Sequence, residues 1–159
     1  MKIKEVHLNM KKKAILIKTS KGVLLSLPFV KLPKLPTVRD PLMGAIVDAE
    51  LGARAVTLQY KSGAAESIHL DAFLEYNQDP SHLREIALHD LTLKARKYLQ
   101  ASGLSKHEVI RRLATSPSQL YRLLDPANTR KSLDEMLRLL AILGYRVEWK
   151  ITNIDKVAA

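Results

Sequence analysis

The 159-residue sequence contains no cysteine, which excludes disulfides, thiolate metal sites and thiol nucleophiles. It also lacks a long apolar run. Near the N-terminus the longest run, Ala14 to Ile17, has only four residues, too few for the core of a signal peptide. No stretch approaches the ~20 apolar residues of a membrane helix, so we expect a cytoplasmic protein with no membrane partner.

The residues that carry most enzyme chemistry are scattered. The six glycines form no phosphate-binding cluster, and no Ser/His/Asp order or paired-carboxylate spacing stands out. His82 and His89 would share one face of a continuous helix, but no third ligand accompanies them. We therefore predict that the protein is not an enzyme and binds no cofactor and no metal. A nuclease-like activity in the first half is a less favoured alternative.

Positive charge is in excess. The chain has 26 Lys and Arg against 16 Asp and Glu, a formal net charge of +10. Such an excess favours a polyanionic partner, nucleic acid before membrane. Because 47% of the residues are hydrophobic and evenly mixed with polar ones, we expect a globular chain that can bury one ordinary core or two small ones.

Residues 1–78 are predicted to form a small β-rich domain for dimerisation or partner binding. Two β-rich runs flank Ser20-Lys21-Gly22, which is a hairpin signal with glycine in the turn. Further strand candidates turn near Gly52 and near Lys61-Ser62-Gly63, and the short helix "DAFLEY" follows them.

In residues 79–159 the apolar residues are spaced differently from those of the first part. Asp79 before Pro80 marks a helix start, and apolar residues then recur at spacings of three and four as far as Gly144. Residues 146–152 alternate apolar and polar side chains, which predicts one strand with one buried face. The predicted fold class is α+β: a small β-rich N-terminal domain, then an all-α domain and a C-terminal strand.

One helix-starting device occurs three times in this second part. Ser105–Glu108, Ser116–Gln119 and Ser132–Glu135 each read S-x-x-E/Q. In this capping box the serine side chain accepts from the backbone N–H three residues on, and the Glu or Gln reaches back to the serine N–H. Each cap is worth ~1 kcal/mol, which makes short helices with tight turns stable enough to form.

Two of these caps begin a helix-turn-helix pattern. Helices are predicted over 105–113 and 116–124, with the turn centred on Ala114 and Thr115. The second helix places three leucines on one side and polar or aromatic side chains on the other, near its N-terminus, from which base edges are read. Alternatively, the caps belong to a plain helical bundle with no DNA partner.

Leu104–Lys150 resembles the lambda-repressor/Xre-type helix-turn-helix, and "YRLLDP" with "SLDEMLRLLAILGYRVE" is similar to the C-terminal domain of HicB-type antitoxins. The resemblance implies an all-α lambda-repressor-like domain whose helix 116–124 enters the major groove. It also implies a set of DNA-binding residues: Lys106, Ser116, Pro117, Ser118, Gln119, Tyr121, Arg122, Asn128, Thr129, Arg130 and Lys131. Of these, Lys106 and the four loop residues 128–131 would contact the phosphate backbone.

The family usually has glycine in the turn, where this chain has Ala114; a positive φ there would cost ~1 kcal/mol. Residues 53–77 resemble, more weakly, a small β-rich bacterial domain of unknown function, and no reaction follows from that likeness.

The leading hypothesis is a sequence-specific regulator of transcription that binds double-stranded DNA as a homodimer. Its interface would involve β structure, from either the first half or residues 146–152. The alternative is an antitoxin that binds a small toxin and regulates its own gene through the same helix-turn-helix. Arg122 is expected to contact a guanine, the alternative being an ion pair with Asp125 at i, i+3.

Overall fold

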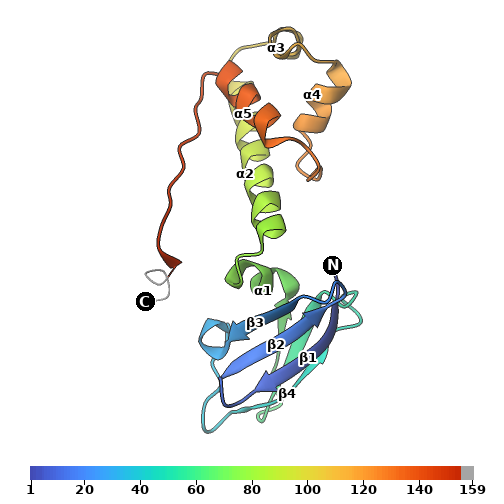
Figure 1. Cartoon of the computed structure of the whole chain (residues 1–159), viewed down its shortest axis with the longest axis vertical. Coiled ribbons are helices and arrows are strands. Elements are labelled where there is room, and N and C mark those ends of the chain that lie inside the picture. The colour runs from blue at the N-terminus through green and yellow to red at the C-terminus, as the bar shows by residue number, and fades with distance from the viewer. Residues whose placement is uncertain (155–159) are drawn as a thin grey trace. The chain divides into compact units, whose positions relative to one another are not determined.

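A computed structural model describes residues 1–154 of the chain, which divides into two compact units, residues 1–83 and 84–159. The elements of the described chain are labelled in Figure 1. In order they are β1 Ile3–Asn9, β2 Ala14–Thr19, β3 Leu24–Pro28, the 3-10 turn η1 Phe29–Lys31, β4 Leu42–Val47, β5 Ala55–Tyr60, β6 Ala65–His69, α1 Leu70–Tyr76, α2 Pro80–Ala101, α3 Lys106–Leu113, α4 Pro117–Leu123 and α5 Leu133–Ile142.

The first unit contains two antiparallel three-stranded sheets, β1-β2-β3 and β4-β5-β6. The predicted hairpin at Ser20-Lys21-Gly22 is confirmed: it joins β2 to β3, and Gly22 adopts φ +78°, which favours glycine. The backbone N–H of Ile3 donates to the carbonyl of Ala53 at 2.7 Å and links the two sheets. The predicted helix "DAFLEY" is confirmed as α1.

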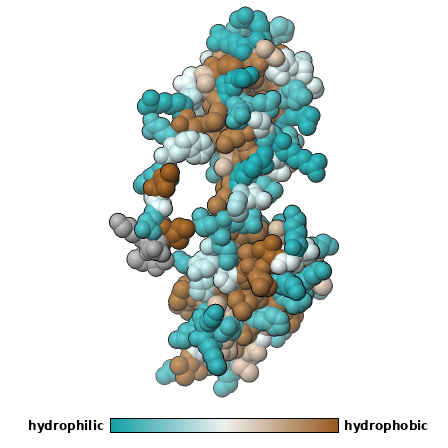
Figure 2. Space-filling model, viewed as in Figure 1, coloured by the Kyte–Doolittle hydropathy of each residue, from teal (hydrophilic) through white to brown (hydrophobic). Residues whose placement is uncertain are grey.

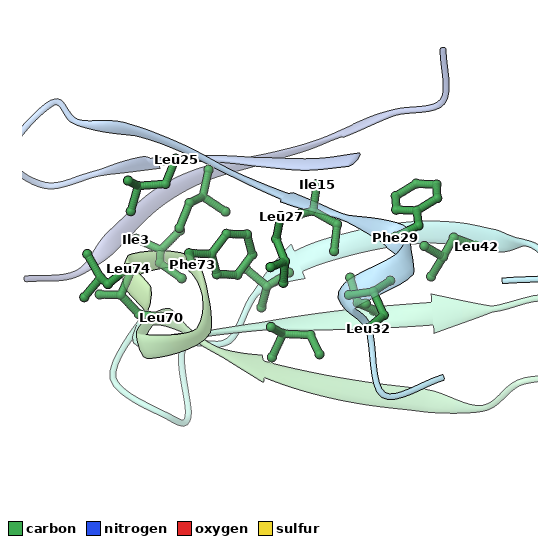
Figure 3. Packing of buried hydrophobic residues seen from close by; sticks show 14 of the residues in the cluster. Ile3, Ile15, Leu25, Leu27, Phe29, Leu32, Leu42, Leu70, Phe73 and Leu74 are labelled. Carbon is green, nitrogen blue, oxygen red and sulfur yellow. The ribbon is translucent and has the colours of Figure 1, made fainter. Parts of the chain in front are cut away.

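The two sheets and α1 enclose one apolar core. Buried side chains of β2 and β3, such as Ile15 and Leu27, point into the same interior that Leu70 and Phe73 of α1 help to fill (Figure 3). The outer edge of β3 is closed at Ser26, whose N–H donates to Asn77 Oδ1 at 3.3 Å and whose carbonyl accepts from Asn77 Nδ2 at 2.7 Å. A side-chain amide therefore occupies the place that a further strand would take.

The second unit is built on α2. The predicted helix start is confirmed, since the helix begins at Pro80 and Asp79 Oδ1 accepts from the N–H of His82 at 3.0 Å. One core forms from buried side chains spaced by three and four on the four helices: Leu88, Leu91, Ala95, Leu99, Val109, Leu113, Leu120, Leu123, Met136, Leu139 and Leu140. No helix formed by residues 1–154 is long and apolar enough to cross a membrane.

The predicted fold class is wrong. The chain is α+β, but its strands are spread over two separate three-stranded antiparallel sheets, so it is not a single β domain followed by an all-α domain. The C-terminal strand is also absent, because residues 146–153 form no strand or bridge with any described part of the chain. An alternating pattern gives a strand only where a neighbouring strand can accept its hydrogen bonds.

Candidate nucleic-acid interface

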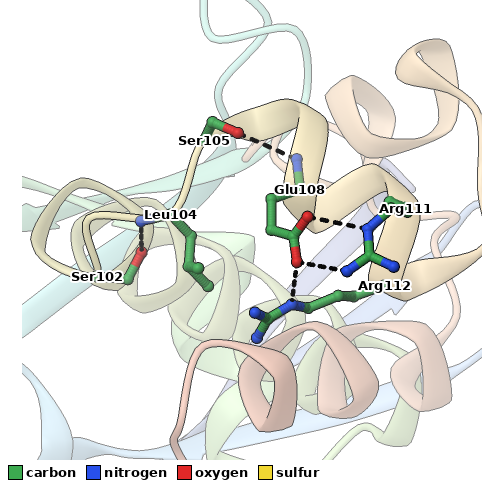
Figure 4. Close-up of polar contacts among 6 residues, drawn as sticks. All are labelled: Ser102, Leu104, Ser105, Glu108, Arg111 and Arg112. Atoms are coloured by element: carbon green, nitrogen blue, oxygen red, sulfur yellow. Dashed lines mark hydrogen bonds and ion pairs between the residues drawn. The ribbon is translucent and has the colours of Figure 1, made fainter.

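The three predicted serine caps are confirmed. The side-chain oxygens of Ser105, Ser116 and Ser132 accept from the N–H three residues on, at 3.1, 3.3 and 3.4 Å. In Figure 4 the side chain of Glu108 turns toward Arg111 and Arg112, so its carboxylate does not complete the reciprocal half of the capping box. Each of the three short helices therefore starts directly after a serine whose side chain caps it.

The turn between α3 and α4 is strained at one residue. Ala114 lies in the left-handed region, with φ 51° and ψ 46°, and ends α3. The N–H of Thr115 closes the turn by donating to the carbonyl of Ile110 at 3.2 Å. The positive φ at the position where the resembled family has glycine is thus present, and an alanine there carries a steric cost.

The side chains of α4 divide between a buried face and an exposed face. Leu120 and Leu123 are buried in the unit's core, while the opposite side is exposed to solvent. The exposed residues of α4 are Pro117, Ser118, Gln119, Tyr121 and Arg122. All five belong to the predicted DNA-binding set. The helix thus presents a continuous polar and aromatic surface that packing does not require.

Lys106 and Tyr121 lie together at one end of this surface. The ammonium of Lys106 lies 5.0 Å from the centre of the Tyr121 ring, a cation–π distance, although the tyrosine is 57% exposed. Both side chains line a groove of about 640 Å³, to which Arg96 of α2 also contributes. The groove thus brings together Lys106 and Tyr121, which belong to the predicted set, and Arg96, which does not.

Glu108 neutralises part of the local positive charge. Its carboxylate accepts from Arg111 at 2.8 and 2.9 Å and from Arg112 at 2.7 Å (Figure 4). The hydrogen bonds from Arg111, and to a smaller extent the one from Arg112, lower the pKa of Glu108 from 4.5 to about 2. The two arginines are therefore held along α3 and are less available to a polyanion than the sequence alone suggests.

Lys131 does not occupy the surface position predicted for it. The residue is only 5% exposed, and its ammonium donates to Thr92 Oγ1 and to the carbonyls of Leu123 and Asp125, at 2.7, 2.7 and 2.6 Å. A lysine ammonium has three donors, and all three are used inside the protein. Lys131 therefore has no donor left for a phosphate, and its burial does not fit the predicted DNA contact.

The rest of the loop after α4 is held by its own polar contacts. Asn128 Nδ2 donates to the carbonyl of Arg122 at 3.1 Å, and Asn128 Oδ1 accepts from the N–H of Arg130, also at 3.1 Å. Arg84 of α2 donates to the carbonyls of Thr129 and Lys131 at 2.9 and 3.0 Å. Asn128 and the Thr129 backbone thus fix the loop, and the Arg130 side chain is left exposed.

A second, smaller groove of about 170 Å³ gathers five of the predicted residues: Gln119, Arg122, Asn128, Arg130 and Lys131. The alternative ion pair between Arg122 and Asp125 does not form among residues 1–154. Instead, Asp125 Oδ1 accepts from the N–H of Ala127 at 2.9 Å. Arg122 and Arg130 are both exposed, and both line this groove.

Three residues of this region were missed from the sequence: Arg84, Thr92 and Arg96. Thr92 carried a usable signal, because it is a polar residue within the apolar stripe of α2 and is fully buried. A buried hydroxyl in that position needs a polar partner, which proves to be Lys131. The two arginines lie on exposed turns of a long helix, and their spacing alone does not distinguish them from other surface cations.

Comparison of the chain with protein-family models, with curated proteins and with solved structures finds no match.

Proposed function

We propose that the protein is a sequence-specific regulator that binds duplex DNA and reads the major groove with α4. The observation that carries the proposal is the division of this helix into a buried leucine face and an exposed polar face beginning at its capped N-terminus. Recognition helices contact base edges with residues near their N-terminal end. The resemblance of Leu104–Lys150 to lambda-repressor/Xre-type domains supports the same function.

Exposed cations flank this helix. Of the six Lys and Arg between Ser105 and Lys131, two are paired with Glu108 and one is buried, which leaves Lys106, Arg122 and Arg130. Lys106 and Arg130 lie in the α3 and loop segments on either side of α4. In the proposed complex these two contact phosphates and set the register, and the α4 side chains contact the bases.

A single unit of this size makes few base contacts, so the proposal includes a homodimer on a two-fold related site. The test is selection of bound sequences from a random duplex pool, followed by affinity measurements at several salt concentrations. With about two to four phosphate contacts per copy, the log–log slope of affinity against salt should be about −4 to −7. Failure to enrich any duplex, or an affinity unchanged by salt, would contradict the proposal.

A second candidate is an antitoxin that binds a small toxin through the first unit. It is favoured by a groove of about 360 Å³ on that unit, in which the apolar side chains of Leu16, Leu24 and Leu25 lie among polar ones such as Glu5 and Lys18. Co-expression with the product of an adjacent small reading frame tests it. A stable complex lost on Leu24→Glu supports this candidate, and two proteins that elute separately reject it.

A further inference from the structure

The chain leaves α5 along a fixed path. Gly144 adopts φ +89°, and the N–H groups of Gly144 and Tyr145 donate to the carbonyls of Ala141 and Leu140 at 3.0 and 2.9 Å. The Tyr145 ring then stacks on Tyr98 of α2, with centroids 3.7 Å apart and planes inclined by 9°. The segment that follows is therefore firmly attached to the second unit.

Residues 146–152, here called the C-terminal arm, have the pattern of a strand with one apolar face. Arg146 and Glu148, two positions apart, form an ion pair at 2.8 Å and so point to the same side. The intervening positions are apolar; Val147 packs partly against the core, but Trp149 is 63% and Ile151 96% exposed. In Figure 2 brown, hydrophobic residues lie beside pale and teal ones along the stretch of chain that follows α5.

We propose that the C-terminal arm pairs antiparallel with the same arm of a second copy, about a two-fold axis at Trp149. In this register Trp149 faces its counterpart, Val147 of each copy faces Ile151 of the other, and Glu148 faces Lys150. Each apolar residue then opposes an apolar residue, and each of these charges opposes its opposite. The arm is complementary to itself.

Registers whose axis is moved by one residue, or lies between residues, lack this match. An axis at Glu148 would place the two Glu148 carboxylates opposite each other and Arg146 opposite Lys150, which are like-charge pairs. An axis at Lys150 would place the two Lys150 ammonium groups face to face. An axis between residues would set the apolar face of one arm against the polar face of the other.

The structure also limits the other surfaces through which two copies could pair by strand addition. The outer edge of β3 is occupied at Ser26 by the Asn77 amide, so that edge cannot accept a full strand. An isolated two-stranded ribbon is marginally stable in water. Each arm, however, is held at Tyr145 and Val147 against a folded unit, so the ribbon would not be isolated.

The pairing extends the proposed function, which expects a two-fold molecule, but it requires no DNA. It is therefore tested on the full chain without DNA, so that its failure and the failure of DNA binding are distinguishable. Trp149 is the sole tryptophan, so its fluorescence reports on the interface directly. We expect a dimer at micromolar concentration by sedimentation velocity, with tryptophan emission that shifts to the blue as the dimer forms.

Charge reversal tests the register. Glu148→Lys and Lys150→Glu should each weaken dimerisation about tenfold or more, because each creates two like-charge pairs, and the double variant should restore it. Glu50→Lys makes the same charge change at an exposed position of the first unit and should leave the dimer unchanged. A double variant as monomeric as the single variants would overturn the proposed register.

Single cysteines give a second test, because the chain has none of its own. Trp149→Cys lies on the axis, within disulfide range of its counterpart, and should form a covalent dimer on mild oxidation. In the proposed register the two Ile151 positions are about 13 Å apart, so Ile151→Cys should not, although it is more exposed. A wild-type chain that stays monomeric, or equal cross-linking at the two positions, would overturn the proposal.

Discussion

The ammonium nitrogen of Lys131 lies 2.7 Å from the hydroxyl oxygen of Thr92, so one polar contact joins the loop after α4 to the buried side of α2. The same ammonium donates to the carbonyls of Leu123, the last residue of α4, and of Asp125, which follows the helix. Burial lowers the pKa of Lys131, while the three oxygen acceptors favour its charged form. Lys131 thus holds the end of the proposed recognition helix against the rest of its unit.

Replacing Lys131 with methionine should therefore destabilise the protein. Lys131→Met leaves one buried hydroxyl and two carbonyls without their donor, and we expect a loss of about 1–3 kcal/mol in the free energy of unfolding. The measurement is urea denaturation followed by circular dichroism. Lys97→Met, at an exposed position of α2, is the matched control and should change the value by less than about 0.5 kcal/mol.

A double-mutant cycle with Thr92→Val separates the contact itself from general effects of each substitution. The two changes should be non-additive, because the second removes an interaction that the first has already broken. A stability equal to that of wild type in Lys131→Met would show that the ammonium contributes nothing to the fold.

Ala114, which has a left-handed backbone conformation between α3 and α4, should have the opposite effect when it is replaced: the protein should become more stable. Ala114→Gly should raise the free energy of unfolding by about 0.5–1 kcal/mol, because glycine adopts φ 51° without the clash of a Cβ. Thermal unfolding at one protein concentration checks this. Ala87→Gly, inside α2, is the control and should lower stability by about 1 kcal/mol. A loss of stability in both variants would mean that the turn is not strained.

Local features of this chain could be predicted, and non-local ones could not. The serine caps and the hairpin at Gly22 each depend on neighbours within a few residues, and all are present. The burial of Lys131 depends on a hydroxyl 39 positions earlier, and no spacing rule specifies that distance. In the C-terminal arm the alternating pattern could be read, but the presence of a partner strand could not.

Glu108 links stability to pH. Its pKa is lowered from 4.5 to about 2 in the folded protein, so its contribution to stability is fully present above pH 4.5 and is lost as the pH falls toward 2. The free energy of unfolding of wild type should therefore exceed that of Glu108→Gln near neutral pH, and the difference should shrink across this range. Denaturation at a series of pH values measures it.

The matched control for the loss of one negative charge is Glu85→Gln, an exposed carboxylate of α2 outside the ion pairs recorded for residues 1–154. It should show no such convergence with wild type at acid pH. A difference between wild type and Glu108→Gln that does not vary with pH would mean that the two arginines do not hold the carboxylate in solution.

Arg122 is the residue on which the proposed reading of DNA depends most. It lies on the exposed face of α4, and no ion pair restrains its guanidinium within the part of the chain that the structure describes. An arginine in the major groove most often donates to guanine O6 and N7 together, and such a contact contributes about 1–3 kcal/mol of discrimination. Because the Arg122 side chain forms no ion pair or hydrogen bond with residues 1–154, binding to DNA would gain this discrimination without breaking such an interaction.

Arg122→Ala should therefore relax sequence preference at one base pair in each half-site, while the melting temperature stays within a degree or so of wild type because an exposed change alters stability by less than about 0.5 kcal/mol. Selection from a random duplex pool, repeated for the variant, gives the preference at every position. Arg39→Ala removes the same charge from an exposed loop of the first unit and should leave the selected sequence unchanged. Arg130→Ala, at the proposed phosphate contact, should weaken binding to all sequences alike and make the salt slope shallower by about one per copy. If Arg122→Ala keeps the full preference of wild type, α4 does not lie in the major groove with this face toward the bases.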